Sequence, residues 1–114
     1  MINDRWVFYK DAKAEKAGNG VTRRVLAYSK DLMCVENTFE KGAVGSLHHH
    51  PHTQITYIVS GSFEFTIDGV KKIVNAGDTM LKMNGVEHGC VCLEAGKLLD
   101  IFNPAREDFV DDVQ

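Results

Sequence analysis

The sequence predicts an all-β protein, built as a sandwich or a barrel, and three observations support this fold class. Short apolar or alternating segments follow one another along most of the chain. Glycine, asparagine and aspartate separate these segments at near-regular spacing, which is typical of antiparallel β-structure. Only two short stretches, residues 11–16 and 106–113, are compatible with helix, and both are expected at the periphery.

The expected strands can be placed in order along the chain. The first follows the Asn19-Gly20 turn, and the strands over 62–67 and 71–74 are joined by Asp68-Gly69, which favours a two-residue hairpin. Further turns separate the other strands, at Gly61, Gly77-Asp78, Asn84-Gly85 and Glu94-Ala95-Gly96. The expected strands cover residues 25–28, 33–39, 55–59, 62–67, 71–74, 79–83, 90–93 and 98–102.

Length, charge and cysteine content predict the number of domains, the kinds of partner and the cellular compartment. We expect one domain over residues 1–114, with a barrel core over roughly residues 21–103 and a peripheral N-terminal strand and C-terminal tail. The net charge of −3 and the lack of a basic block predict neither a nucleic-acid partner nor a membrane partner. Residues 1–16 lack the apolar run of a secretory signal, and three cysteines do not suit a closed disulfide framework, so we expect a cytoplasmic protein.

The histidines carry the main chemical signal of the sequence. Four of the five lie within residues 48–52, and His88 stands alone. Side chains alternate between faces along an extended chain, so His48 and His50 are expected on one face. Two imidazoles do not complete a metal's coordination sphere, and His88 could return to them, with Gln54 as an oxygen donor that suits several divalent metals. From these residues alone, a solvated tract that binds metal incidentally is the competing interpretation.

The spacing of these residues resembles the two sequence motifs of the cupin family. In the first motif, a Gly, His-x-His, an acid and a second Gly follow at fixed intervals, and in the second a Gly, Pro-x-Gly, His and Asn do so. The chain matches the first at Gly42, His48-His49-His50, Gln54 and Gly61, and the second at Gly77, Met83-Asn84-Gly85, His88 and Cys92. The resemblance implies a closed antiparallel jelly-roll β-barrel with two Greek keys. It also implies one divalent metal ion, held by His48, His50, His88 and Gln54.

Three positions depart from the family pattern, and Gln54 is the one with chemical consequences. Gln54 replaces the usual Glu, Met83 the usual Pro, and Cys92 the usual Asn. A carboxamide leaves the full charge on a divalent ion, whereas Glu would reduce it. We therefore expect weaker metal affinity and a stronger Lewis acid. Ni, Zn, Mn and Fe all suit such a donor set, and the sequence does not choose among them.

A narrower resemblance covers most of the chain. Residues 50–61, 63–69, 76–78 and 99–109 are similar to small pectin-degradation cupins of the KdgF type, which also place a Gln among the metal ligands. Those proteins convert 4,5-unsaturated uronates, the products of polysaccharide lyases, into linear 5-keto-4-deoxyuronates. The resemblance implies the same isomerase-like reaction on a small anionic sugar acid. It also places Asp100, Phe102 and Arg106 in or beside the pocket as catalytic residues.

The residues themselves leave the roles of these three side chains open. Alternation along 98–102 puts Asp100 and Phe102 on one inward face. Asp100 could transfer a proton, or it could be a structural carboxylate paired with the backbone or with Arg106. Arg106 could clamp a substrate carboxylate in a bidentate contact, or it could lie on the surface at the start of a helix.

Two other functions and one assembly state complete the expectations. A site of three histidines with open positions would also serve a metal-dependent dioxygenase, and a pocket without turnover would make the protein a sugar- or metabolite-binding module. A homodimer is expected because residues 5–9 are aromatic, strand-like and close to a terminus, where bare aromatic side chains are costly. The family resemblance implies dimers that exchange or pair such strands.

Overall fold

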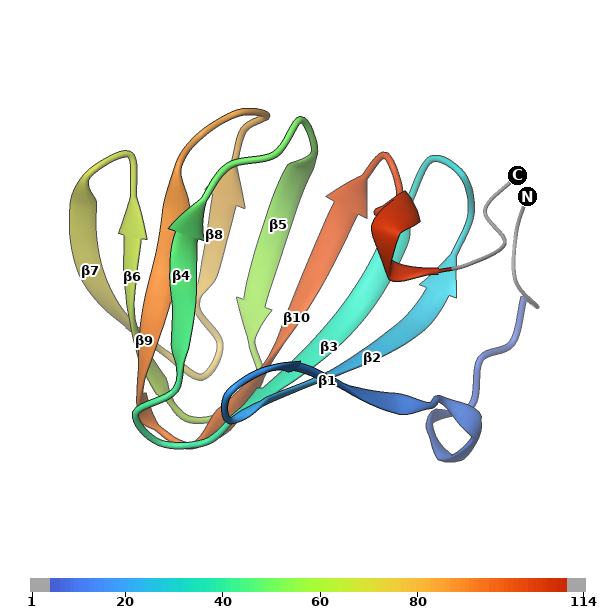
Figure 1. Ribbon diagram of the computed structural model, residues 1–114, viewed down its shortest axis with the longest axis horizontal. Coiled ribbons are helices and arrows are strands. Elements are labelled where there is room, and N and C mark those ends of the chain that lie inside the picture. Colours follow the sequence, from blue (N-terminus) through green and yellow to red (C-terminus); the bar gives the residue numbers. More distant parts are fainter. Residues whose placement is uncertain (1–4, 111–114) are drawn as a thin grey trace.

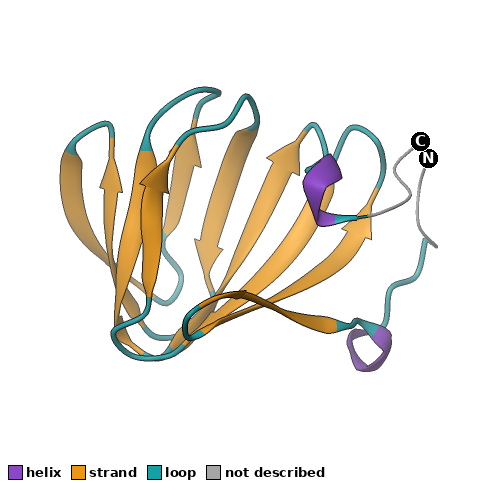
Figure 2. Cartoon of the chain, in the orientation of Figure 1, coloured by secondary structure: helices purple, strands orange, loops and turns teal. Residues whose placement is uncertain are grey.

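The computed structural model describes residues 5–110, which form two antiparallel sheets that face each other (Figures 1 and 2). The six-stranded sheet has the order β1 (Ala14–Gly18), β2 (Val21–Tyr28), β3 (Met33–Phe39), β10 (Gly96–Asn103), β5 (Thr53–Ile58) and β8 (Thr79–Lys82). The four-stranded sheet has the order β4 (Val44–His48), β9 (His88–Glu94), β6 (Ser62–Ile67) and β7 (Val70–Asn75). Two single-turn 3-10 helices, η1 (Tyr9–Asp11) and η2 (Glu107–Phe109), flank the strands.

The two sheets do not close into a barrel, which corrects the expected closed barrel to a sandwich-like jelly roll. The edge strands β1 and β4 both line one pocket between the sheets. Hydrogen bonding between these two edges would close the space that they line. The pocket therefore lies on the open side of the sandwich.

Most strand predictions are confirmed, and the errors concern the first 48 residues and the C-terminal end. β3 and β6 have the predicted bounds, whereas β1 and β4 were not expected. The predicted helix over 11–16 is wrong, because residues 14–18 pair with β2 as strand β1. The predicted strand over 5–9 is also wrong, since this segment is irregular and leads into η1. The predicted helix over 106–113 is reduced to η2, and its residues 111–113 lie outside the described part.

The Asp68-Gly69 hairpin is confirmed by its backbone geometry. Asp68 has a φ of 50° and Gly69 a φ of 77°, so both central residues are left-handed, as a type I′ turn requires. Ile67 and Val70 pair directly across the turn. This local sequence thus fixes the register of β6 against β7.

The interior consists of two apolar clusters with a polar layer between them. The larger cluster contains Phe39, Ile58, Phe63, Phe65, Cys90, Cys92 and Leu98, together with Val21 and Ala43. The smaller one contains Met33, Val35, Phe102 and Ala105, and it is covered by Phe109, the last residue of η2, and by Val110. We call the inward-facing residues between them the polar layer; they are Asn37, Gln54, Thr56, Lys82 and Asp100.

The polar layer crosses four neighbouring strands of the six-stranded sheet, β3, β10, β5 and β8. Along β10 the inward positions read Leu98, Asp100 and Phe102, so the strand passes from one cluster through the layer into the other. No helix within residues 5–110 has the length and apolar content needed to cross a membrane.

Candidate metal centre

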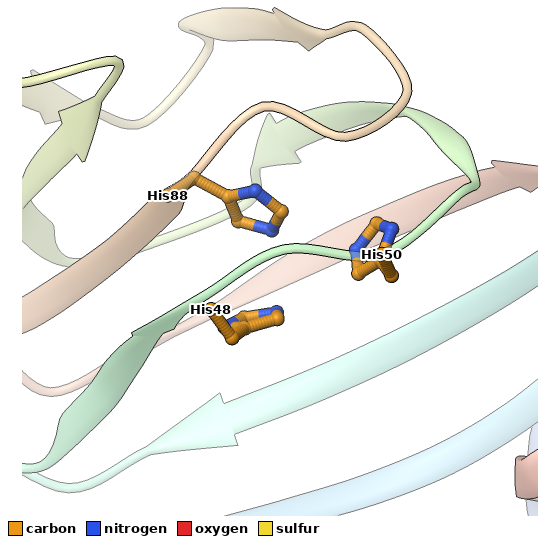
Figure 3. A group of neighbouring side chains, drawn as sticks. All are labelled: His48, His50 and His88. Atoms are coloured by element: carbon orange, nitrogen blue, oxygen red, sulfur yellow. The ribbon is translucent and has the colours of Figure 1, made fainter.

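Three imidazoles converge at the end of the four-stranded sheet that borders the pocket. His48 is the last residue of β4 and His88 the first of β9, and their Cα atoms are partners across the ladder. His50 follows β4 in the segment that crosses to β5. The ligand atoms of the three residues all lie within 4.8 Å of one another, and Figure 3 shows the rings turned toward a common point. His49 is exposed, as alternation predicts.

Backbone carbonyl groups fix the orientation of two of these rings. Nδ1 of His48 lies 2.7 Å from the carbonyl oxygen of Ser46, and Nδ1 of His88 lies 3.0 Å from that of Val86. A ring that donates from Nδ1 to a carbonyl keeps its lone pair on Nε2. Both Nε2 atoms are thereby prepared to bind a metal.

His50 and Gln54 complete the convergence. Nε2 of His50 lies 3.1 Å from Oε1 of Gln54, which enters from β5 on the opposite sheet. At this separation both atoms could bind one ion, because metal–nitrogen and metal–oxygen bonds are about 2 Å long. His52 packs behind His50, with the ring centroids 5.2 Å apart, and does not join the group.

Burial favours the neutral form of His50 and His88, which is the form that binds metal. Burial, followed by the positive charge of Lys82, lowers the pKa of His88 to about 4. Burial, followed by the charge of Arg106, also lowers the pKa of His50. Burial raises the pKa of Cys90 to about 11, so this nearby thiol is protonated at neutral pH and is a poor ligand.

Asp100 is the centre of a buried hydrogen-bond network. Oδ1 accepts hydrogen bonds from Gln54 Nε2 at 2.7 Å and from Thr56 Oγ1 at 2.6 Å. Oδ2 accepts one from Asn37 Nδ2 at 2.8 Å. The Asp100 carboxylate is therefore held by three donors directly behind Gln54, and only one of its four lone-pair positions stays available.

Lys82 adds a positive charge to the polar layer. Its side chain is 2% exposed, and Nζ donates to Thr56 Oγ1 at 2.8 Å and lies 4.5 Å from the centre of the Phe65 ring. Burial lowers the pKa of Lys82, and the Asp100 charge acts in the opposite direction. Lys82 is the Cα partner of Gln54, which places it beside the histidine group.

The side chains of Phe102 and Arg106 lie at the pocket on the η2 side. Phe102 is buried, and its ring stands 5.8 Å from that of His50. The Arg106 guanidinium stacks over Phe102 and Phe109 at 5.3 Å and 4.3 Å from the ring centres. One of its edges is paired with Asp108, through Nε at 3.0 Å and Nη2 at 2.8 Å. A substrate carboxylate on that edge would have to displace Asp108.

Most of these groups line one pocket of about 720 Å³ between the sheets, a size typical of small-molecule sites, whereas His50 and Thr56 lie behind its lining. Its lining includes His48, Gln54, His88, Asp100, Phe102 and Arg106, all of which the sequence pointed to. The sequence did not point to Asn37, Thr56 and Lys82. All three lie in predicted strands. Alternation along β5 places Thr56 on the face of Gln54, and the pairing of β5 with β8 joins Lys82 to Gln54.

Known proteins resemble this chain closely in sequence and in structure. Residues 35–102 match the cupin domain family. The chain is 44% identical over 98 residues to the pectin degradation protein KdgF of Dickeya dadantii. The aligned region covers 84% of this chain and 89% of that protein. An RmlC-like cupin from Shewanella frigidimarina superposes with a TM-score of 0.93 at 41% identity, over 96% of this chain and 98% of that one. KdgF from Halomonas sp. gives a TM-score of 0.90 at 33% identity, over 95% and 100% of the two chains.

Proposed function

The chain belongs to the cupin domain family, and from that premise we propose that it is a metal-dependent enzyme that converts a 4,5-unsaturated uronate into a linear 5-keto-4-deoxyuronate. The observation that carries this proposal is the convergence of His48, His50, His88 and Gln54 at one pocket. Its lining includes His48, Gln54 and His88 together with Asp100 and Arg106. The 44% identity to a pectin degradation protein supports the substrate class.

We infer that one divalent ion is held by the three Nε2 atoms and by Gln54 Oε1. Neutral imidazoles and a carboxamide oxygen fit Ni, Zn, Mn or Fe. A bound ion of this kind supplies Lewis acidity toward a carboxylate or ring oxygen of the substrate. The exposure of His48 leaves that side of the site open to a ligand.

The charges of the pocket favour an anionic ligand. Its lining contains Arg23, Lys82 and Arg106, and among the described residues Asp100 is the one acidic side chain in it. Arg23 and Arg106 are paired with Glu15 and Asp108, whereas Lys82 contacts the Thr56 hydroxyl and the Phe65 ring. A sugar acid would therefore enter a field of positive potential.

Within this pocket, the proposed roles follow from position. The free lone-pair position of Asp100 can accept a proton from the substrate and return it during ring opening. Arg106 binds the substrate carboxylate, either with its unpaired edge or by exchanging Asp108 for it. Phe102 packs against His50 and supports the stacked guanidinium of Arg106.

The test is the loss of the conjugated-alkene absorbance of an unsaturated uronate on addition of the protein with each candidate metal. We expect a decay faster than the spontaneous reaction, abolished by a chelator. His48→Gln should remove the acceleration, whereas His49→Gln, an exposed neighbour in the same tract, should retain it. A wild-type protein that leaves the spontaneous rate unchanged with every metal would contradict the proposal and favour a binding module.

We also infer that the protein is a homodimer. Outward side chains on three neighbouring strands form a continuous surface, which we call the outer apolar patch; it consists of Ile55, Tyr57, Leu81, Leu99 and Ile101. Trp6 and Phe8 add two exposed aromatic side chains in the N-terminal segment, 74% and 59% exposed. Such surfaces are costly in water, and a second copy of the chain would cover both.

A further inference from the structure

The carboxamide of Gln54 lies between Asp100, which contacts its nitrogen, and His50, which contacts its oxygen. Its Nε2 donates to Asp100 Oδ1 at 2.7 Å and to Thr56 Oγ1 at 3.2 Å. Its Oε1 lies on the other side, 3.1 Å from Nε2 of His50. An ionised carboxylate only accepts hydrogen bonds, so Asp100 requires the amide nitrogen on its side. The oxygen is left facing the imidazoles.

The Asp100 carboxylate acts only as a hydrogen-bond acceptor in this arrangement. Lys82 Nζ and Gln54 Nε2 are both donors to Thr56 Oγ1, so the single hydroxyl proton of Thr56 points to Asp100. Asn37 donates to the other carboxylate oxygen. Every hydrogen bond around Asp100 therefore has a fixed direction, from the surrounding donors to the carboxylate.

We propose that Asp100 is a positioning residue for Gln54. Its negative charge requires a carboxamide, and not a carboxylate, at position 54, and it holds the amide oxygen toward the imidazoles. Residues 54 and 100 form one unit, in which the negative charge is held at 100 and a neutral oxygen is presented to the imidazoles. This inference rests on the proposed metal centre and adds the reason for its neutral fourth donor.

The substitution Gln54→Glu would break the unit. The second oxygen of the new carboxylate would take the place of Nε2, in contact with Asp100 Oδ1, and two like charges would face each other in a buried layer. The new side chain would have to turn away or hold a proton, and both outcomes weaken its bond to a metal. From charge alone a glutamate would bind a cation more tightly than a glutamine. The contact with Asp100 predicts the opposite for Gln54→Glu.

Exchanging the two groups should restore the unit. In Gln54→Glu/Asp100→Asn, the amide introduced at position 100 donates to the carboxylate at position 54, and its oxygen accepts from Asn37. Thr56 then turns its proton to that carboxylate while still accepting from Lys82. The total charge and the number of atoms are those of the native pair. In Asp100→Asn alone, the new amide can keep its oxygen toward Gln54 if the Asn37 amide turns over. The effect of this single substitution on metal affinity should therefore be small.

The experiment is a double-mutant cycle on metal affinity, measured with Ni²⁺, Zn²⁺ and Mn²⁺ by competition with a chromophoric chelator and without any uronate. We expect Gln54→Glu to weaken binding at least tenfold, and the double variant to recover to within about threefold of the wild type. The same cycle on urea unfolding of the metal-free protein should show a favourable coupling between the two substitutions.

Asn37→Asp is the matched control, because it also places a carboxylate against Asp100 but on the side away from Gln54. It should lower stability without lowering metal affinity. Gln54→Glu binding metal as tightly as the wild type, a wild type that binds none of the ions, or the absence of coupling in both cycles would overturn the inference. Failure of uronate turnover with an intact cycle would instead count against the proposed reaction alone.

Discussion

Lys82 places a buried positive charge in the pocket lining, and no carboxylate lies within 4.0 Å of its Nζ among residues 5–110. A buried ammonium with a single hydroxyl acceptor is costly to fold, because burial penalises the charged form. Met at this position would fill the same space without that cost. The charge is therefore better explained by a ligand than by the fold.

Lys82→Met tests this explanation. We expect the affinity for a saturated uronate such as galacturonate to fall about tenfold or more, since a hydrogen bond between charged groups contributes on the order of 1.5–3 kcal/mol. Isothermal calorimetry on the metal-loaded protein measures this affinity. The uncharged sugar galactose should show no such difference.

Lys72→Met serves as the control, because Lys72 is exposed on β7 and lies outside the pocket lining. It removes the same charge from the whole molecule but not from the pocket. If both variants lose affinity equally, only net charge matters. If neither does, Lys82 has no part in binding the anion.

Among the site residues, those at fixed motif spacings could be predicted from the sequence. His48, His50, Gln54 and His88 stand at fixed motif intervals, and their side chains do converge. The family resemblance implied Asp100, and alternation along its strand predicted that it faces inward. Lys82 was not found because hydrophobicity favours Leu81 as the inward residue of β8, whereas the structure leaves Leu81 58% exposed. Pairing with Gln54 decides that orientation, and a single sequence does not show pairing.

Among the elements, two connections between the sheets meet at the end of the sandwich where β10 begins. The β5–β6 turn and the β9–β10 turn contact each other through their backbones. A Cβ on Gly96 would overlap with the carbonyl oxygen of Ser60, and one on Gly61 would stand 2.6 Å from that of Glu94. Only residues without a side chain allow this approach.

Gly96→Ala is therefore expected to destabilise the protein strongly, by about 3 kcal/mol or more, because the obstacle is backbone and cannot rotate away. Gly69→Ala is the comparison. Gly69 has a φ of 77°, but open space surrounds its Cβ position, so only the backbone strain of about 1–2 kcal/mol applies. Urea unfolding monitored by the fluorescence of Trp6 or by circular dichroism gives both values. Equal losses would show that the turn contact is not under steric constraint.

The elements that the sequence mispredicted share a physical cause. Residues 14–18 are rich in Ala, Glu and Lys, which favour helix, yet pairing with β2 outweighs that local preference. β4 contains Gly45 and Ser46, and its residues are mostly exposed on a sheet edge, so it lacks an alternating pattern. β3, β6 and the Asp68-Gly69 turn were predictable because burial and turn geometry leave clear local signals there.

For the whole molecule, the open sandwich and the polar layer belong together. A fully apolar interior would favour closing the sheets, whereas the layer from Asn37 to Lys82 borders the pocket between them, where we propose that the substrate binds. The family resemblance predicted the jelly roll, and the structure confirms its all-β architecture. The closed form of the barrel was wrong because the edges β1 and β4 line the pocket instead of pairing with each other.

The outer apolar patch leads to a prediction about assembly. Light scattering coupled to gel filtration should give about 25 kDa, twice the chain mass of 12.7 kDa. Leu81→Arg should reduce this mass to that of a monomer, because it puts a charge into an apolar surface that would face its own copy across the interface. Ile73→Arg, at 60% exposure close to the 58% of Leu81 but on the outer face of the other sheet, should leave the dimer intact. A wild-type monomer would reject the dimer, and dissociation by Ile73→Arg alone would move the interface to the four-stranded sheet.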